Sequence, residues 1–469
     1  MTTATVIDGG LSAVADGLHA AGVLCPGRKE PVDLVVARAD AAERALSVKA
    51  RSYLLLGRVD PRIVRRSGLV ASQLLVLGTS DRPASVLPLG SADSAHYYLS
   101  RMAAPVEPSR RLRNAGATAL LRGGLPVSRF VGGSRVATVL GLPSDRGRLP
   151  HLVSVACGAD AHRSARVSWV LALGRGDDLQ RAVFHVLDQG RLRWVVKFSR
   201  VRGAVDAFDR DAIGLGLAHS AGEPVAAHAP SLLARLDADG LPGSVETAAA
   251  GRPLVERLAR RPRPLIDSIA RWVVEMGMAT AAPPERLEPE RRRLSTDVLP
   301  TWVARGATTD LLARLPPVPG VLQHNDLGSW NILTDGRDFT AVDWESARAV
   351  GMPLWDLLYF LADALVRMEG PADVEVMERR CLALFRGGSP YSSTLFGWVR
   401  LAVAGLSIPP EAVGRLATLC WMHHGLSATL RESALGGAQP APLGHLARLA
   451  APWLADRALG PTWSQWTSG

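Results

Sequence analysis

Residues 321–347 read VLQHNDLGSWNILTDGRDFTAVDWESA, and this stretch decides the fold. An apolar entry leads into His324 and Asp326, and Asn331 follows Asp326 after a gap of four residues. We expect a strand at ILT, a turn at DGRD, and a second strand at FTAVDW that ends at Asp343. The pattern therefore predicts a loop, a hairpin, and a carboxylate at the far end of the hairpin.

These polar residues form a set that suits phosphoryl transfer. Such a reaction needs a carboxylate that orients a hydroxyl group and accepts its proton, and oxygen ligands that hold magnesium on the phosphates of ATP. Magnesium prefers hard oxygen donors, which Asp326, Asn331 and Asp343 supply. A gap of four residues lets one loop present a base and a metal ligand on the same side, and a short hairpin can return a second carboxylate there.

The pattern H-x-D-x-x-x-x-N followed by D-x-E resembles the aminoglycoside phosphotransferase and choline kinase family, which has the protein-kinase-like fold. In this chain it reads His324, Asp326, Asn331, Asp343 and Glu345. The resemblance implies that Asp326 is the catalytic base and that Asn331 and Asp343 are magnesium ligands. It also implies that His324 supports the loop rather than acting as the base.

Two neighbouring features extend the resemblance. Family members often have Gly where this chain has Asn325, and the run PLWDLLYFL at 353–361 is similar to the family's helix after the metal-binding strand. Asp356 in that run would be structural, capping or anchoring the catalytic loop.

Two alternatives to a catalytic site stay open. The Asp and Asn side chains of the motif could simply cap turns at the surface, or the site could bind nucleotide without catalysis.

The order of predicted elements upstream and downstream favours two lobes. Strands at 166–174, 182–188 and 193–199 are joined by short polar turns, which is typical of an antiparallel meander. A helix at 204–220 and two further strands, LLARLDADG and GSVETAAAG, follow. After Gly251 the pattern is mostly helical, with helices expected at 354–368, 411–435 and 443–459. A β-rich part followed by an α-rich part predicts an α+β fold, with an antiparallel β N-lobe and a helical C-lobe.

Lys197, on the third predicted strand, is the expected cation for the phosphates. It is one of only three lysines in a chain that otherwise uses arginine, together with Lys29 and Lys49. A compact ammonium group fits between phosphates where a planar guanidinium group does not. The alternative is a strand lysine that extends to solvent. The family usually pairs this lysine with a Glu on the next helix, where Asp211 aligns best here.

Two further nucleotide contacts follow from the resemblance. Gly174 and Gly176 lie between the first two strands of the meander, where a flexible loop would cover the ATP phosphates, although many hairpin turns also contain such a pair. The run GSVETAAAGRPL resembles the family's interlobe hinge. The backbone from about Glu246 to Ala248 would meet adenine there.

The first 150 residues carry no chemical motif. Short predicted strands at 33–39, 52–58 and 72–78 indicate a small α/β or α+β accessory domain over 1–110. An Arg-, Gly- and Pro-rich connector follows at 111–150. The predicted N-lobe is then 151–252 and the predicted C-lobe, with the catalytic loop, 253–469.

Composition narrows the function classes. A net charge of +10 could attract anionic partners such as nucleotides, but no recognised nucleic-acid motif accompanies it, so no nucleic acid is expected. Four scattered cysteines indicate reduced thiols rather than a zinc site. No segment is long enough to span a bilayer and no secretory signal is visible, so the expected compartment is the cytoplasm.

From the motif and Lys197 we expect a small-molecule kinase that uses ATP and Mg²⁺ on a sugar, an aminoglycoside or an amino alcohol. The alternative is a nucleotide-binding regulatory module. The sequence does not indicate an oligomeric state.

Overall fold

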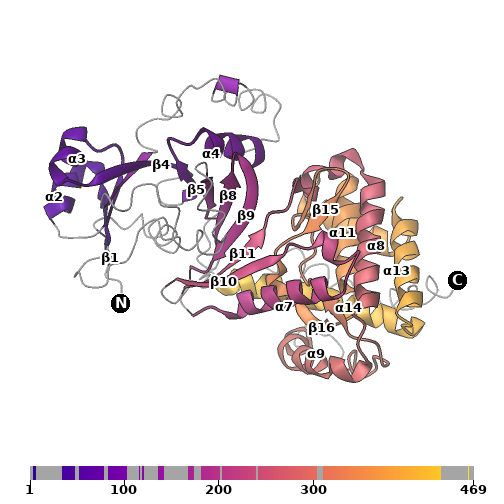
Figure 1. Ribbon diagram of the computed structural model, residues 1–469. Coiled ribbons are helices and arrows are strands. Elements are labelled where there is room, and N and C mark those ends of the chain that lie inside the picture. Colours follow the sequence, from indigo (N-terminus) through magenta and orange to yellow (C-terminus); the bar gives the residue numbers. More distant parts are fainter. Residues whose placement is uncertain are drawn as a thin grey trace. The chain divides into compact units, whose positions relative to one another are not determined.

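The chain forms two compact units, residues 1–205 with 232–248 (unit 1) and residues 206–231 with 249–469 (unit 2). Figure 1 shows the computed structural model. It describes residues 4–6, 34–47, 52–78, 83–102, 116, 119–120, 136–141, 167–173, 181–200, 203–238, 241–303, 310–434 and 463.

Unit 1 contains one sheet with the strand order β1-β2-β3-β6-β4-β5-β7-β8-β9-β11-β10. The three strands β1, β2 and β3 are parallel to one another, and every other pairing is antiparallel. The strands are β1 (Ala4–Val6), β2 (Leu34–Arg38), β3 (Ser52–Leu56), β4 (Val70–Gly78), β5 (Pro83–Pro88), β6 (Val136–Gly141), β7 (Val167–Ala172), β8 (Ala182–Asp188), β9 (Arg191–Phe198), β10 (Leu232–Ala238) and β11 (Leu241–Thr247).

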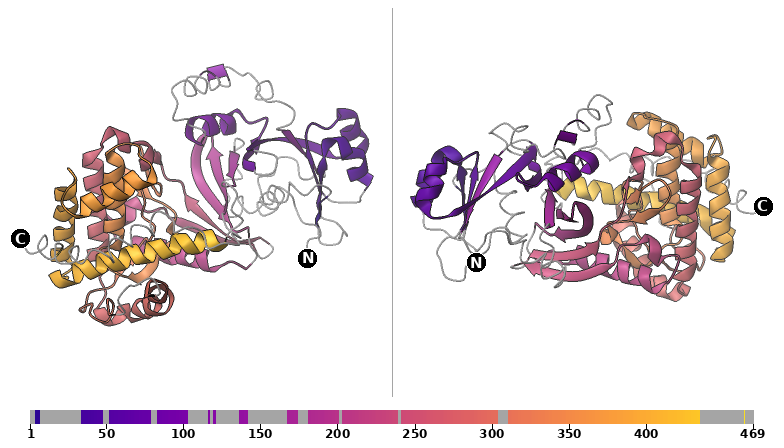
Figure 2. Two further views of the ribbon diagram at one scale, coloured as in Figure 1. Left: turned by 180° about the vertical axis from the view of Figure 1, so that it is seen from behind. Right: turned by 45° about the horizontal axis from the view of Figure 1, so that its top comes forward.

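The front strands and the predicted meander are hydrogen bonded into this same sheet. β5 pairs with β7 through Ser85 opposite Ala172 and Val86 opposite Leu171. Val86 is fully buried in a cluster that also contains Phe184 of β8. The predicted accessory module is therefore not set apart as a body of its own, and the boundaries at 110, 150 and 252 stay predictions. Figure 2 shows these strands in two further views.

Among the described residues of the first 102, the front strands are accompanied by α2 (Ala42–Ser47), α3 (Pro61–Ser67) and α4 (Ala92–Tyr97). On α4, the hydroxyl group of Tyr97 lies 2.9 Å from Nδ1 of His185 on β8. Burial raises the pKa of Tyr97 to about 12 and lowers the pKa of His185 to about 4, so both side chains are neutral at physiological pH. This contact is a neutral hydrogen bond between the front of the chain and the meander.

The apolar runs and polar turns in the sequence correctly predicted the strands of the meander. The strand expected at 182–188 is β8 with the same bounds, and the strand expected at 193–199 is β9, which begins two residues earlier. Five strands in the order β7-β8-β9-β11-β10, followed by a mainly helical part, agree with the predicted mixed α+β kinase-like fold.

Unit 2 is mainly helical. Its helices are α7 (Asp206–Ser220), α8 (Arg263–Ala279), α9 (Glu288–Arg293), α10 (Leu299–Val303), α11 (Trp355–Met368), α12 (Val374–Phe385), α13 (Ser392–Gly405) and α14 (Pro410–Ala434). The short strands are β12 (Arg252–Pro253), β13 (Val321–Gln323), β14 (Ile332–Thr334), β15 (Phe339–Ala341) and β16 (Arg348–Gly351).

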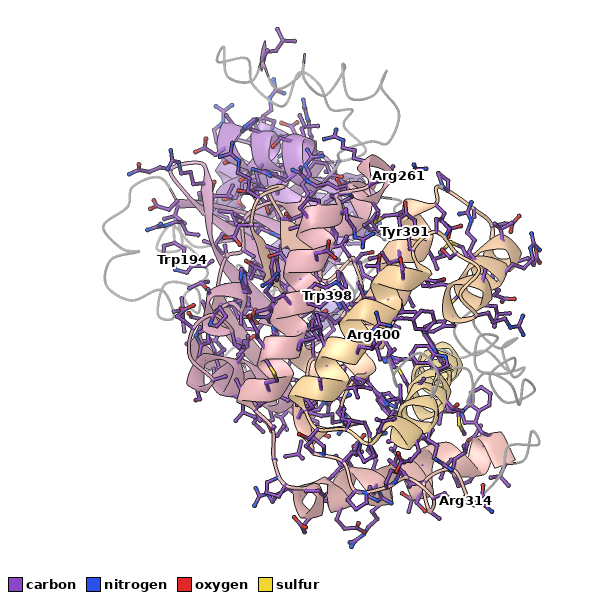
Figure 3. All side chains as sticks on the ribbon, turned by 90° about the vertical axis from the view of Figure 1, so that its right-hand side faces the viewer. Trp194, Arg261, Arg314, Tyr391, Trp398 and Arg400 are labelled. Carbon is purple, nitrogen blue, oxygen red and sulfur yellow. The ribbon has the colours of Figure 1, made fainter. Side chains whose placement is uncertain are left out.

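The central helix of unit 2 is α11, which packs against α8, α12, α13 and α14. Nearly all of its residues are buried, as expected for a helix that is apolar on every side. α8 and α13 lie side by side, and Trp398 of α13 donates its indole N–H to Asp267 of α8 at 2.9 Å (Figure 3). This packing holds the elements that flank the predicted catalytic loop.

Several helix predictions are confirmed. The helix expected at 411–435 is α14, and α8 begins at Arg263 because Pro264 is tolerated only in a first helical turn. The helix expected at 443–459 lies outside the described residues. Among the described helices, none has the length and apolar character needed to cross a membrane.

Candidate active site

The predicted catalytic loop begins where β13 ends. Asn325 adopts a left-handed backbone with φ of 63°, a conformation that Gly, and among other residues Asn, tolerates best. Its side-chain Nδ2 donates to the carbonyl oxygen of Ser346 at 3.2 Å. The family's preference for Gly at this position therefore has a physical reason here, since the chain must turn with positive φ before Asp326.

Asp356 anchors this bend from the first turn of α11. Its two carboxylate oxygens accept the backbone N–H of His324 at 2.6 Å and of Asn325 at 2.8 Å. Burial raises the pKa of Asp356 to about 6, while the two backbone donors act in the opposite direction. The structural role that we expected for Asp356 is thus visible as a pair of hydrogen bonds to the loop.

His324 connects the loop to the segment before Asp343. Its side chain is fully buried, its Nε2 lies 3.0 Å from the carbonyl oxygen of Val342, and its ring centroid is 4.8 Å from that of Trp344. A buried imidazole fixed in this way joins the two halves of the motif. This geometry fits the supporting role expected for His324.

Asp326 and Asn331 are in direct contact. Nδ2 of Asn331 donates to the carboxylate Oδ2 of Asp326 at 3.1 Å and to its carbonyl oxygen at 2.9 Å. A turn between them is closed by the N–H of Gly328, which donates to the Asp326 carbonyl oxygen at 2.8 Å. Because Nδ2 is used in this way, the amide oxygen of Asn331 is the atom that remains for a hard cation.

The hairpin brings Asp343 back to Asn331. β14 and β15 pair in register, with Ile332 opposite Ala341, and the carbonyl oxygen of Asn331 then accepts the N–H of Val342 at 2.8 Å. Asp343 follows directly with φ of 69°, a strained conformation for an acidic residue that is found preferentially at functional sites. The structure thus joins Asp326 to Asn331 and Asn331 to Val342 by hydrogen bonds, and Asp343 is the next residue after Val342.

The turn of the hairpin is stabilised by its own polar groups. Oδ1 of Asp335 accepts the backbone N–H of Arg337 at 2.8 Å and of Asp338 at 3.0 Å, as in an Asx turn. Both hydrogen bonds lower the pKa of the Asp335 carboxyl, and the one from the N–H of Asp338 has the larger effect. The DGRD turn expected from the sequence is therefore confirmed.

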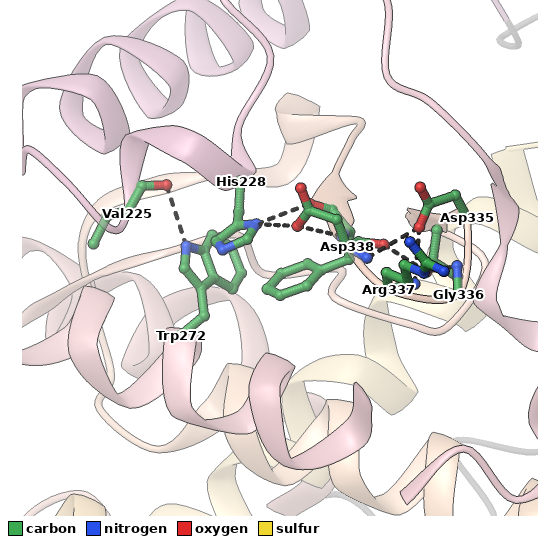
Figure 4. Close-up of polar contacts among 9 residues, drawn as sticks. Val225, His228, Trp272, Asp335, Gly336, Arg337 and Asp338 are labelled. Atoms are coloured by element: carbon green, nitrogen blue, oxygen red, sulfur yellow. Dashed lines mark hydrogen bonds and ion pairs between the residues drawn. The ribbon is translucent and has the colours of Figure 1, made fainter. Parts of the chain in front are cut away.

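A second contact set supports the hairpin from outside, and sequence reasoning missed it. Figure 4 shows His228, whose Nδ1 lies 2.9 Å from the carbonyl oxygen of Phe339 and 3.4 Å from the carboxylate of Asp338. Its ring stacks on Phe339 with centroids 3.9 Å apart. Beside it, the indole of Trp272 donates to the carbonyl oxygen of Val225 at 3.2 Å. No sequence motif marks His228 as part of this cluster.

The residues after Asp343 are packed against α7. Nε of Arg210 donates to the carbonyl oxygen of Glu345 at 2.7 Å. A methyl group at Gly214 would lie 2.6 Å from Cβ of Ala347, so only Gly permits this approach. Glu345 therefore contacts α7 through its backbone. Asp211 is also on α7 and is buried in unit 2.

Lys197 lies in unit 1 as a buried ion-paired residue. Its Nζ is 2.7 Å from Oε1 of Glu246, and both side chains are less than 10% exposed. The alternative of a solvent-exposed strand lysine is thus wrong. Ser244 also donates to Oε1 of Glu246, at 3.3 Å. We expected only the backbone of Glu246 to take part in nucleotide binding. The ion pair between its carboxylate and Lys197 was not predicted from the sequence. The pairing of Lys197 with Asp211 stays a prediction.

The other nucleotide contacts remain predictions. Gly174 and Gly176 lie outside the described residues. The N–H of Ala248 donates to the carbonyl oxygen of Arg193 at 3.0 Å, and the adenine contact expected from the backbone between Glu246 and Ala248 stays a prediction. His423 and His424 of α14 are buried, and their rings stack on Trp355 and Tyr359, respectively.

Comparisons with solved structures give distant likenesses. A thermostable mutant of aminoglycoside phosphotransferase APH(4)-Ia, in a ternary complex with ADP and hygromycin B, is 16% identical over 66% of this chain and 97% of that chain, with a TM-score of 0.37. APH(3'')-Id from Streptomyces rimosus, in complex with ADP and streptomycin, is 18% identical over 59% and 94%, with a TM-score of 0.31. Monomeric WbdD is 14% identical over 82% and 74%, with a TM-score of 0.26.

No curated protein matches the chain. A family match does exist, to the phosphotransferase enzyme family (APH), over residues 173–391. This range contains the strand that carries Lys197 and the complete segment from His324 to Glu345. The resemblance inferred from the motif is thereby confirmed, because residues 173–391 of this chain match the model of the phosphotransferase enzyme family.

Proposed function

We propose that this protein is a small-molecule kinase that moves the γ-phosphate of ATP to a hydroxyl group with the help of Mg²⁺. The observation that carries the proposal is the link from Asp326 through Asn331 to the residue before Asp343. A carboxylate, an amide oxygen and a second carboxylate are what a magnesium-dependent phosphoryl transfer requires of a protein.

Each residue has a role that its contacts support. Asp326 orients the acceptor hydroxyl group and takes its proton as the acceptor oxygen bonds to the γ-phosphorus, while the bond from that phosphorus to the β–γ bridging oxygen breaks and ADP leaves. Asn331 holds the carboxylate of Asp326 and, with Asp343, supplies oxygen ligands for Mg²⁺. His324 and Asp356 fix the loop and do not exchange protons with substrate. Magnesium neutralises phosphate charge when it is bound, and ATP supplies the phosphoryl group.

Lys197 is the proposed phosphate-pairing cation of unit 1. The carboxylate of Glu246 holds its ammonium group in place through the ion pair at 2.7 Å. Gly174 and Gly176 would cover the phosphates, and the backbone near Ala248 would meet adenine.

A thermal shift experiment tests the nucleotide site. A ligand that binds only the folded protein raises the unfolding midpoint once its concentration exceeds its dissociation constant. We expect Mg²⁺ and ATP together to raise the midpoint of the wild type, and Asp343→Asn to lose the magnesium-dependent part. If neither ATP nor Mg²⁺ shifts the wild type, the kinase proposal fails.

Turnover decides between a kinase and a regulatory module. The kinase should form ADP when an acceptor is added, and Asp326→Asn should abolish this while retaining the ATP-dependent shift. Magnesium-dependent nucleotide binding without transfer to any acceptor would instead favour the regulatory module. The sheet shared by the front strands and the meander would then connect nucleotide binding to the first 150 residues.

A further inference from the structure

A cavity of about 50 Å³ lies in unit 2 beside the predicted catalytic loop. This is space for a few water molecules, so only a compact group fits inside it. Its lining residues come from the catalytic loop, α11, α12 and α14: Trp330, Tyr359, Ala362, Asp363, Val366, Arg367, Met377, Glu378, Cys381 and Trp421.

The cavity and the loop share one wall. Trp330 directly precedes Asn331, and the backbone N–H of its other neighbour, Ser329, donates to Oδ2 of Asp363 at 2.9 Å. A methyl group at Gly328 would lie 2.3 Å from the Trp330 ring, so this ring packs directly on the loop backbone. A molecule in the cavity would therefore lie next to the loop that carries Asp326.

Three aromatic side chains define the shape of the cavity. The Trp330 and Tyr359 rings are nearly perpendicular, at 87° with centroids 6.1 Å apart, and the Trp421 ring lies 6.4 Å from that of Tyr359. His424 stacks on Tyr359 at 4.0 Å and fixes its orientation. Trp330 is 37% exposed, whereas Tyr359 and Trp421 are buried. Such walls suit a planar or compact apolar ring.

The charges of the cavity do not suit a polycation. Asp363 accepts the Ser329 N–H and also forms an ion pair with Arg367, so its charge is balanced within the wall. Glu378 is the one further carboxylate among the lining residues. A molecule with several ammonium groups would need several uncompensated carboxylates, because buried charges must be paired.

One of the lining residues, Trp421, carries a buried polar atom. The indole N–H of Trp421 is buried and has no hydrogen-bond partner within the part of the chain that the structure describes. Buried polar groups are normally hydrogen bonded, so an acceptor atom on a bound molecule would satisfy it.

We propose that this cavity binds the acceptor substrate, and that the acceptor is an uncharged hydroxylated molecule with an aromatic or other planar ring and an oxygen atom that accepts from the Trp421 N–H. This inference rests on the proposed kinase function. It replaces the sugars, aminoglycosides and amino alcohols expected from the sequence with uncharged alcohols that carry an aromatic or other planar ring.

The test measures binding without nucleotide, by saturation-transfer NMR. The probes are benzyl alcohol, 2-phenylethanol and indole-3-ethanol, compared with glucose, choline and streptomycin. We expect the three aromatic alcohols to bind and the other three not to bind. Binding should weaken at least fivefold in Trp330→Ala and in Trp421→Phe, which keeps a ring but removes the N–H donor. Leu401→Ala removes an exposed apolar side chain of α13 that is not among the lining residues, and it should leave binding unchanged.

Each outcome separates the two proposals. If no aromatic alcohol binds, or if Trp330→Ala binds them as well as the wild type, the cavity proposal is overturned while a magnesium-dependent ATP shift still supports a kinase. Tighter binding of choline or streptomycin also overturns it. If aromatic alcohols bind but ATP and Mg²⁺ cause no thermal shift, the kinase function fails, and the cavity is a binding site but not an acceptor site. Faster ADP formation with a bound alcohol supports both.

Discussion

Asp356 accepts a hydrogen bond from the backbone N–H of Asn325 at 2.8 Å, although the two residues are 31 positions apart in the chain. The same carboxylate accepts the N–H of His324. One side chain of the central helix α11 therefore determines the conformation of the loop that presents Asp326.

Replacing this anchor should damage both stability and activity. In Asp356→Asn one carboxylate oxygen becomes an NH₂ donor that faces a backbone donor, so one buried N–H loses its partner. We expect a loss of about 1–3 kcal/mol in unfolding free energy, measured by urea denaturation, and a large loss of ADP formation. Asp373→Asn is the control, since Asp373 caps α12 from an exposed position and Asn caps equally well. Equal losses in the two variants would contradict the anchor role.

The raised pKa of Asp356 predicts how stability depends on pH. Because its folded-state pKa of about 6 lies above the ordinary 3.8, the folded protein holds this proton more tightly than the unfolded chain. Its contribution to the unfolding free energy is therefore present below about pH 4 and falls as pH rises to about 6, by on the order of 2 to 3 kcal/mol.

The variant Asp356→Asn isolates this titration. Asn does not ionise, so the difference in unfolding free energy between wild type and variant should change between pH 4 and pH 6 and stay constant above pH 7. Urea denaturation at half-unit pH intervals measures it. A difference that stays constant over the whole range would show that Asp356 has an ordinary pKa in the folded protein.

Asn325 offers a test of the backbone geometry alone. Ala at a positive φ costs about 1–2 kcal/mol, and Asn325→Ala also loses the hydrogen bond to Ser346, so we expect a lower thermal midpoint and reduced turnover. Asn325→Gly loses the same side-chain hydrogen bond but adopts this φ without strain, so it should retain more activity than Asn325→Ala. If the two variants behave alike, the side-chain hydrogen bond rather than the backbone conformation holds the loop.

The sequence predicted well what depends on local signals. β8 and β9 follow from apolar strands bounded by polar turns, and the Asp335 turn follows from its side-chain chemistry. The spacing of the motif indicated that Asp326, Asn331 and Asp343 belong together. These features need no information beyond about twenty neighbouring residues.

Contacts between distant segments were not predictable in the same way. His228 stacks on Phe339 from 111 positions away, and neither residue carries a motif. The pairing of Lys197 with Glu246 depends on strand register, which places Ser244 opposite Lys197 and so brings Glu246 within reach. Trp330, for which the motif indicates no role, is partly exposed and lines a cavity. Register and cavity shape are properties of the folded chain that one sequence does not display.

The Lys197–Glu246 pair allows structural and functional roles to be separated. Removing one partner of a buried ion pair leaves an uncompensated charge and typically costs about 3–5 kcal/mol. We expect Lys197→Met and Glu246→Gln each to be strongly destabilised in urea, and the double variant to lose clearly less than the sum of the two. The exposed pair of Arg66 and Glu43 in the same unit is the control, since removing an exposed pair costs about 1 kcal/mol or less.

The double variant then reports on the ammonium group itself. If Lys197 serves only to neutralise Glu246, a folded double variant should still show the midpoint shift caused by ATP and Mg²⁺. If the ammonium group pairs with phosphate, as we propose, that shift should be much smaller in the double variant even where its stability approaches that of the wild type. An undiminished shift in the folded double variant would therefore remove Lys197 from the nucleotide site, because no other change in the variant could restore the lost cation.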